Sequence, residues 1–311
     1  MNAMLFLQAK KQPSRLPPRL PSAHRHTLRN KQRQTRTALL FLAPSLAGVF
    51  ILVLVPFGDA VRRSFFTAMS GEFVGLKNYE AVLQNEAFRL AAQNTLRFIA
   101  ACIPVLLALS LLLAVMIRTV RRRGELYKTA FLLPIAIPVA SVVLLWTVFF
   151  HEKGLLSGLV EALGGTRMDW MNSDAAFNIL VLSYLWKNAG YDMVLFLAGL
   201  GGISPSLYEA ARVDGAGVWA LFRHITLPSL LPTLFTVAVL SLLNSFKVFR
   251  EAFLVAGNYP HKSMYMLQHL FNNWFAALDI QKLCAAAVLV ALFILALVLL
   301  LQKLWGNEEL S

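Results

Sequence analysis

The sequence predicts an all-α membrane protein with six transmembrane helices. Of its 311 residues, 58% are hydrophobic and only 14% are charged, whereas a soluble domain carries about 25% charged residues. The mean hydropathy is +0.61. A helix needs about 20 apolar residues to cross the hydrocarbon, where the backbone has to satisfy its own hydrogen bonds. Six apolar runs of about this length follow one another, at 39–57, 95–117, 129–150, 177–200, 230–246 and 283–301.

Prolines and cysteines inside these runs call for a structural interpretation. Pro134 and Pro138 fall in the third run and are expected to bend that helix, because proline removes a backbone donor. Cys102 and Cys284, the two cysteines of the chain, both lie within apolar runs. We therefore interpret them as small buried hydrophobic residues rather than as a disulfide or a metal site.

Charge indicates the orientation of the spans. The net charge is +13, and residues 1–37 contain nine Lys and Arg and no acid, while residues 118–128 contain five against one Glu. Because basic flanks stay in the cytoplasm, we expect both termini and the loop 201–229 to be cytoplasmic, in a multi-pass protein of the inner (plasma) membrane. Residues 1–36 are predicted to be a disordered basic tail that contacts anionic membrane lipid, not nucleic acid.

The loop 201–229 contains the signals of two short helices. Ser204 is expected to be an N-cap, Pro205 suits the first helical position, and Ile203 and Tyr208 suit a hydrophobic staple. Asp214-Gly215 predicts a break, since glycine adopts left-handed backbone conformations. The second helix is expected to carry an apolar stripe and to end before a proline; these residues are Val218, Phe222, Ile225 and Leu227-Pro228.

An apolar stripe in the cytoplasm needs a protein surface to cover it. It packs either beneath its own bundle or into a partner. A DNA-binding helix-turn-helix is a poor third interpretation, because Arg212 and Arg223 are offset by Glu209 and Asp214.

This segment resembles the EAA motif of binding-protein-dependent ABC importer permeases. The matching residues are Glu209-Ala210-Ala211, Asp214-Gly215-Ala216, Phe222, Ile225, Leu227-Pro228 and Pro232. The resemblance extends over roughly Leu39 to the C-terminus and includes Val74–Tyr79, Asn94-Thr95, Pro134, Trp186, Gly190 and Met193. It is most similar to the first permease of carbohydrate importers of the maltose and glycerol-phosphate type. One departure is Gly257-Asn258-Tyr259-Pro260, where those permeases usually carry Gly-Gly-Pro.

The resemblance implies a fold and a set of partners. Residues 37–311 would form a type I ABC importer transmembrane domain, with coupling helices at about 204–228 that dock on a cytoplasmic ATPase. Glu209 would anchor them by charged hydrogen bonds, Gly215 would make the turn, and Val218 and Phe222 would pack in the ATPase groove. The implied partners are a second permease in a heterodimer, two ATPase subunits and an extracytoplasmic solute-binding protein. The full set of implied coupling residues is Glu209, Ala210, Ala211, Asp214, Gly215, Ala216, Val218, Phe222, Ile225, Leu227 and Pro228.

Motifs of catalysis are absent from the sequence. No phosphate-binding Gly-x-x-x-x-Gly-Lys-Ser/Thr occurs, and neither His-Glu-x-x-His nor Gly-x-Ser-x-Gly is found. We therefore expect no enzyme activity and no cofactor on this chain, with ATP and Mg bound by the partner ATPase. Alternatives are a permease for a non-sugar solute, an ion-coupled secondary transporter and, less well supported, a membrane-embedded enzyme.

Polar residues inside the spans are candidates for the substrate pathway. They are Tyr184, Lys187, Asn188 and Tyr191 in the fourth run, and Asn244 and Ser245 in the fifth. Their hydroxyls, amides and aromatic ring suit a sugar; helix packing and interfacial anchoring are the alternative. Lys187 and Asp192 are not expected to pair, because five residues turn a helix by about 140°.

Overall fold

The chain folds as helices in two units. The computed structural model describes residues 39–68, 70–120 and 124–305; the predicted disordered tail 1–36 lies outside these residues. One unit covers Met1–Asp59 and the other Ala60–Ser311. A helix runs from Leu39 in the first unit to Ser64 in the second, through a π turn, η1 (Phe50–Leu54), into α2 (Val55–Ser64). It confirms the first predicted span.

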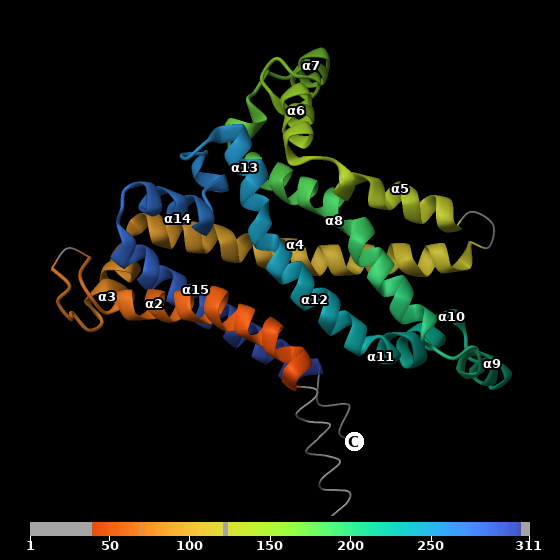
Figure 1. Cartoon of the computed structure of the whole chain (residues 1–311). Helices are drawn as coiled ribbons and strands as arrows, with labels where there is room; N and C mark the ends of the chain where they lie inside the picture. Colours follow the sequence, from red (N-terminus) through yellow and green to blue (C-terminus); the bar gives the residue numbers. More distant parts are fainter. Residues whose placement is uncertain (1–38, 69, 121–123, 306–311) are drawn as a thin grey trace, which may run out of the picture. The chain divides into compact units, whose positions relative to one another are not determined.

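The second unit is built on the packing of α4 (Glu86–Thr119) against α8 (Ala176–Gly201). Phe98, Cys102 and Leu106 of α4 are buried in one cluster with Leu180 and Tyr184 of α8. The Ser110 hydroxyl donates to the Ala189 carbonyl at 3.0 Å and ties the two helices together. Apolar burial and this hydrogen bond hold α4 and α8 together. The two helices cross in Figure 1.

The third predicted span is broken at a proline. The break lies at Ile137-Pro138, between α5 (Gly124–Ala136) and α6 (Val139–Phe150). Pro138 is the N-cap of α6, while Pro134 remains inside α5. Glycine at position 190 allows α5 to approach α8 closely, because a Cβ there would overlap the Phe131 carbonyl.

The fifth predicted span continues beyond its expected end. α12 (Leu231–Ser245) runs through the short η4 (Phe246–Val248) into α13 (Phe249–Ala256). The last predicted span corresponds to α15 (Ile280–Trp305). Among the described residues, five helices are long and apolar enough to cross a membrane, and a sixth is obtained by joining α8 to α9 (Pro205–Val213) across a 69° bend.

Short helices cover the ends of the spans. Gly75, with φ +58°, makes the predicted turn before α3 (Lys77–Gln84). The Asn94 amide of α4 donates to the carbonyls of Lys262 and Tyr265 at 2.7 and 3.0 Å. α7 (Leu155–Ala162) continues the candidate span Val139–Ala162 that α6 begins. The remaining short elements here are η2 (Trp170–Asn172), η5 (Lys262–Met264) and α14 (Leu267–Ala276).

His269 on α14 is a buried histidine in this layer. Its ring lies against Phe249 and Tyr265, with centroids 4.7 and 5.7 Å away. Burial lowers the pKa of His269 to about 4, so the imidazole is neutral at neutral pH. Its Nδ1 accepts a hydrogen bond from the Met266 backbone N–H at 3.1 Å.

Candidate functional site

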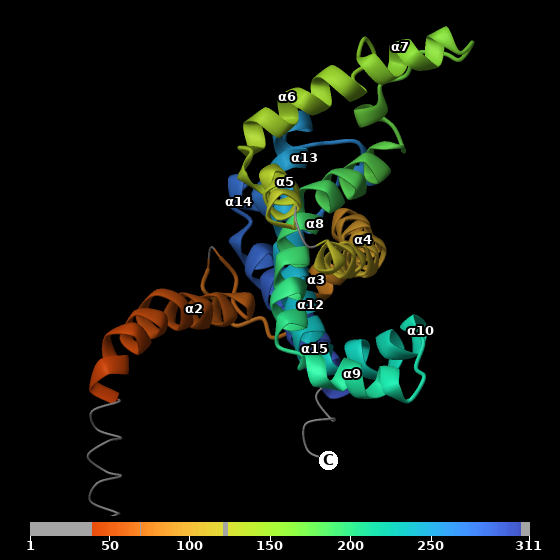
Figure 2. The same cartoon turned by 90° about the vertical axis from the view of Figure 1, so that its right-hand side faces the viewer.

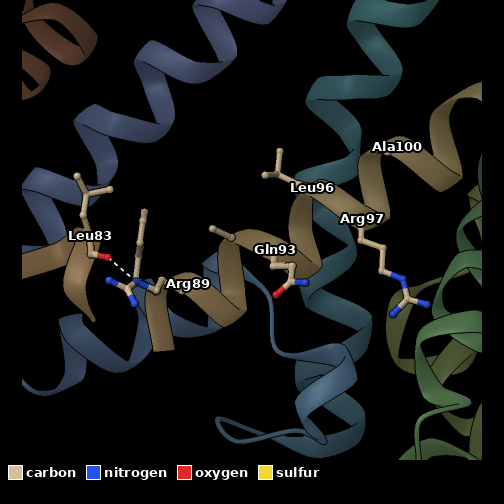
Figure 3. Close-up of a pocket in the computed structure, with 8 residues that line it drawn as sticks. Leu83, Arg89, Gln93, Leu96, Arg97 and Ala100 are labelled. Atoms are coloured by element: carbon tan, nitrogen blue, oxygen red, sulfur yellow. Dashed lines mark hydrogen bonds between the residues drawn. The ribbon is translucent and has the colours of Figure 1, made fainter. Parts of the chain in front are cut away.

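The charged residues of α4 bound an apolar stretch that is long enough to cross a membrane. Between Arg97 and Arg118 lie twenty residues without a charged side chain, which span about 30 Å of helix and match the hydrocarbon thickness. A groove of about 570 Å³ follows α4 from Phe88 to Ala100, at the Arg97 end of this stretch. There Arg89 donates to the Leu83 carbonyl at 2.8 Å, the dashed line in Figure 3, and the Arg97 guanidinium lies 4.4 Å from the centre of the Phe177 ring.

The predicted coupling segment lies at the Arg118 end. α9 begins at Pro205, as expected, and Gly215 has φ +83° at the break that follows. Ser204 holds the predicted N-cap position, although its side chain makes no cap hydrogen bond and its hydroxyl lies 2.8 Å from that of Ser206. Ile203 and Tyr208 belong to one apolar cluster, in line with a staple.

The second short helix does not end at Leu227-Pro228. α10 (Val218–Leu221) continues through a π turn, η3 (Phe222–Thr226), into α11 (Leu227–Ser229), and α12 begins two residues later. Proline has no N–H and clashes with the carbonyl four residues before it. A π turn bonds five residues back, as the Leu227 N–H does to the Phe222 carbonyl, so the chain passes Pro228 without ending the helix.

The expected apolar stripe is divided between two environments. Ile225 packs on the chain's own cluster, whereas Val218 is 86% exposed. Phe222 stacks on Trp219 with centroids 5.7 Å apart, and Trp219 is 70% exposed. The coupling tip, defined as Val213, Val218 and Trp219, therefore presents bare apolar surface where α9 ends and α10 begins. Figure 2 shows these two helices at one end of the second unit.

Tyr208 connects the coupling segment to the spans, a role that the sequence did not reveal. Its hydroxyl is 3.0 Å from that of Thr226 in η3 and accepts from Arg118 at 3.4 Å. The Arg118 guanidinium also lies 5.2 Å from the Tyr208 ring centre. One side chain thus joins α9, η3 and the end of α4. Glu209 is exposed and has no ion-pair partner among the described residues.

The remaining predicted coupling residues line the same turn. Ala211 and Ala216 are half-buried and Ala210 is exposed, as is Asp214, whose backbone N–H bonds the Ala210 carbonyl at 3.1 Å. The structure brings these residues together in one compact segment. Their role toward a partner remains a prediction.

The predicted pathway residues of α8 cluster with acids that the prediction did not include. Lys187 donates to Glu251 of α13 at 2.7 Å, with side chains only 15% and 11% exposed. Asp192 accepts from the Ser241 hydroxyl at 2.6 Å, so Lys187 and Asp192 are indeed not paired with each other. The Tyr184 hydroxyl donates to the Ser241 carbonyl at 3.1 Å. We call Lys187, Glu251, Asp192, Ser241 and Tyr184 the intramembrane polar cluster.

Several predicted pathway residues have structural hydrogen bonds. Asn188 donates to the Tyr184 carbonyl at 2.9 Å, and Ser245, which is buried, donates to the Leu242 carbonyl at 2.6 Å. Asn244 is half-buried and accepts from Lys247 at 2.7 Å. Tyr191 is half-buried on α8. Contact with cargo remains a prediction for all of them.

Long apolar helices, a loop with an exposed apolar tip and a charged pair inside the spans are features of a membrane transport subunit. Residues 106–305 match the family of "Binding-protein-dependent transport system inner membrane component". The chain belongs to this family and is a permease subunit of such a transport system.

Individual relatives agree with this assignment. The chain is 33% identical to the sn-glycerol-3-phosphate transport system permease protein UgpA of Yersinia pestis, over 83% of this chain and 90% of the relative. It is 30% identical to the arabinooligosaccharides transport system permease protein AraP of Bacillus subtilis, over 86% and 88%. A chain from a bacterial ABC transporter "involved in the import of the acidic polysaccharide alginate" has the same fold, with a TM-score of 0.76 at 23% identity over 90% of this chain and 99% of that chain.

Proposed function

We propose that this permease forms the pathway for a sugar or sugar derivative and is driven by a separate ATPase. The coupling tip carries the proposal: Val213, Val218 and Trp219 are 88%, 86% and 70% exposed, and apolar surface of this kind marks a protein contact. The names of the relatives UgpA and AraP support a sugar or sugar phosphate as cargo.

The coupling segment is suited to transmit force. Glu209 would anchor it by charged hydrogen bonds to the ATPase, since an exposed carboxylate accepts such bonds strongly. Gly215 makes the turn, and Val218 and Phe222 would fill an apolar groove. Because α9 follows α8 across a 69° bend, movement of the ATPase would be passed to α8 and rock the spans between two states.

The remaining partners follow from the family. A second permease would complete the pathway as a heterodimer, and two ATPase subunits would bind ATP and Mg. An extracytoplasmic solute-binding protein would deliver the cargo, which the family description supports. The chain itself would catalyse no reaction, and both termini would lie in the cytoplasm of a cell with the permease in its inner (plasma) membrane.

ATP-dependent uptake tests the proposal. The complete transporter, with its partner permease, ATPase and binding protein, is reconstituted in liposomes, and uptake of a panel of radiolabelled sugars and sugar phosphates is measured with and without ATP. We expect accumulation of at least one of them, lost in Glu209→Ala and retained in the matched control Glu152→Ala. Uptake without ATPase subunits would instead support an ion-coupled transporter.

A further inference from the structure

A polar hollow lies at the end of the spans opposite the coupling segment. It encloses about 430 Å³ where the end of α6, the turn η2 and the loop after α13 meet. This volume falls within the usual range of small-molecule sites. We call this hollow the outer vestibule; the lining residues that matter are His151, Asp169, Asn172, Tyr259 and His261.

Both histidines of the outer vestibule present a donor. Nδ1 of His151 accepts from the Lys153 backbone N–H at 3.2 Å, and Nδ1 of His261 accepts from the Ser263 backbone N–H at 3.4 Å. In a neutral imidazole whose Nδ1 accepts, Nε2 carries the hydrogen. Each ring therefore offers an N–H at Nε2 for a ligand.

The outer vestibule also contains hydrogen-bond acceptors and an exposed aromatic ring. Asp169 uses Oδ1 to accept from the backbone N–H groups of Met171 and Asn172, both at 3.2 Å, and its second oxygen has lone pairs to spare. The exposed Asn172 amide can donate and accept. The Tyr259 side chain is 79% exposed, so its ring face is open to stacking.

These groups match the chemistry of a neutral saccharide. A sugar ring has hydroxyls that both donate and accept, together with an apolar face that packs on an aromatic ring. The one carboxylate among the lining residues, that of Asp169, repels an anion but accepts from a sugar hydroxyl. The composition of the outer vestibule thus favours an uncharged sugar unit over an acidic one.

The position of the outer vestibule fits an entrance to the pathway. η2 precedes the first residue of α8, whereas the coupling segment follows its last residue, about 39 Å away along a helix of 26 residues. On the other side of the hollow, Val255 of α13 lines it and lies one helical turn from Glu251 of the intramembrane polar cluster. Cargo in the hollow would thus be one helical turn of α13 away from the polar interior of the spans.

We propose that the outer vestibule binds a neutral saccharide unit on its way into the membrane, with Tyr259 as the stacking surface and Asp169, Asn172, His151 and His261 as hydrogen-bonding groups. This inference rests on the proposed function, because it assigns a sugar contact to a permease for sugars. It adds a site at the end of the spans, separate from the intramembrane polar cluster.

Saturation-transfer NMR on the assembled transporter in nanodiscs, without binding protein, tests the outer vestibule. Maltose and glucuronate are the probes. We expect a maltose signal stronger than that of glucuronate, reduced about fivefold by Tyr259→Ala, the size of one lost aromatic contact, and retained by Tyr259→Phe. The matched control is Tyr127→Ala, which removes an equally large ring that is 41% exposed on α5.

Two results would overturn the inference. Maltose signals that are absent in the wild type, or equal in wild type and Tyr259→Ala, would remove the saccharide site. A Tyr259→Ala variant that keeps the maltose signal but needs more binding protein for half-maximal ATPase stimulation would make the hollow a protein contact. Either result would leave ATP-dependent uptake by the liposomes unchanged. The saccharide site can therefore be wrong while the proposed function stands.

Discussion

The coupling tip and the intramembrane polar cluster reverse the usual placement of side chains in opposite ways. Val218 and Trp219 are apolar and 86% and 70% exposed, where water rather than lipid is expected. Lys187 and Glu251 are charged and only 15% and 11% exposed inside the spans. Exposed apolar surface is stabilised by a partner, and buried charge by an internal counter-charge. We therefore expect the first region to depend on another chain, whereas the second is stabilised within this one.

The largest expected effect lies in the intramembrane polar cluster. Lys187→Met leaves the Glu251 carboxylate buried without its counter-charge, which should destabilise the fold by about 3 kcal/mol. The double variant Lys187→Met/Glu251→Leu should recover most of this loss. Thermal unfolding of the assembled transporter in nanodiscs measures both, and additive losses in the double variant would contradict the pairing.

An exposed ion pair provides the control for that experiment. Lys128 and Glu125 are 2.6 Å apart, with side chains 34% and 88% exposed. Lys128→Met should cost only about 0.5 kcal/mol, since water screens such pairs. If Lys128→Met lost as much stability as Lys187→Met, the loss would be caused by removal of the charge itself and not by burial of the remaining partner.

A charge on the coupling tip should act on the partner instead of on the fold. Val218→Asp places a carboxylate where we propose an apolar groove, and it should weaken ATPase binding by about thirtyfold, or roughly 2 kcal/mol. Stability of the permease should change by less than about 0.5 kcal/mol. Titration of solubilised permease with the ATPase subunit gives the affinity. Leu163→Asp, at a position 80% exposed after α7, should leave the affinity unchanged.

The smallest expected effect concerns the link between the coupling segment and the spans. Tyr208→Phe removes the hydroxyl contacts with Thr226 and Arg118 but keeps the ring, at a cost of about 1 kcal/mol. Hydrogen exchange in residues 204–229 should become about fivefold faster, with little change elsewhere. Tyr127→Phe is the matched control; equal acceleration by both variants would argue against a local link.

The sequence predicted the elements best where one physical rule acts alone. Hydropathy located the spans at 177–200 and 283–301 close to α8 and α15, because lipid permits only helices there. Gly215 predicted its turn, since its left-handed φ of +83° is costly for other residues. Pro134 and Pro138 predicted a bend in the third span; the helix breaks at Pro138 but continues through Pro134.

Features that depend on two distant segments escaped prediction. Glu251 follows Lys247 and Arg250, so the apolar run seemed to end at Phe246, although the helix continues and brings Glu251 to Lys187. The π turn at Phe222–Thr226 leaves no pattern in residue types, and it carries the chain past Pro228. The sequence predicted only a hydrophobic staple for Tyr208, because its contact with Arg118 arises from the packing of α9 beside the end of α4.

The central claim is that the coupling segment transmits the force of ATP hydrolysis to the spans. It is tested most directly by introducing a proline at either of two glycines in the turn, Gly215 or Gly217. Proline fixes φ near −65°, which Gly215 at φ +83° cannot accommodate but Gly217 at φ −74° can. Sugar uptake and ATP hydrolysis are measured together in liposomes with the complete transporter. We predict that Gly215→Pro lowers uptake at least about tenfold, while the permease remains at its normal level in the membrane, and that Gly217→Pro transports normally. Normal uptake by Gly215→Pro, or equal losses in both variants, would contradict the account.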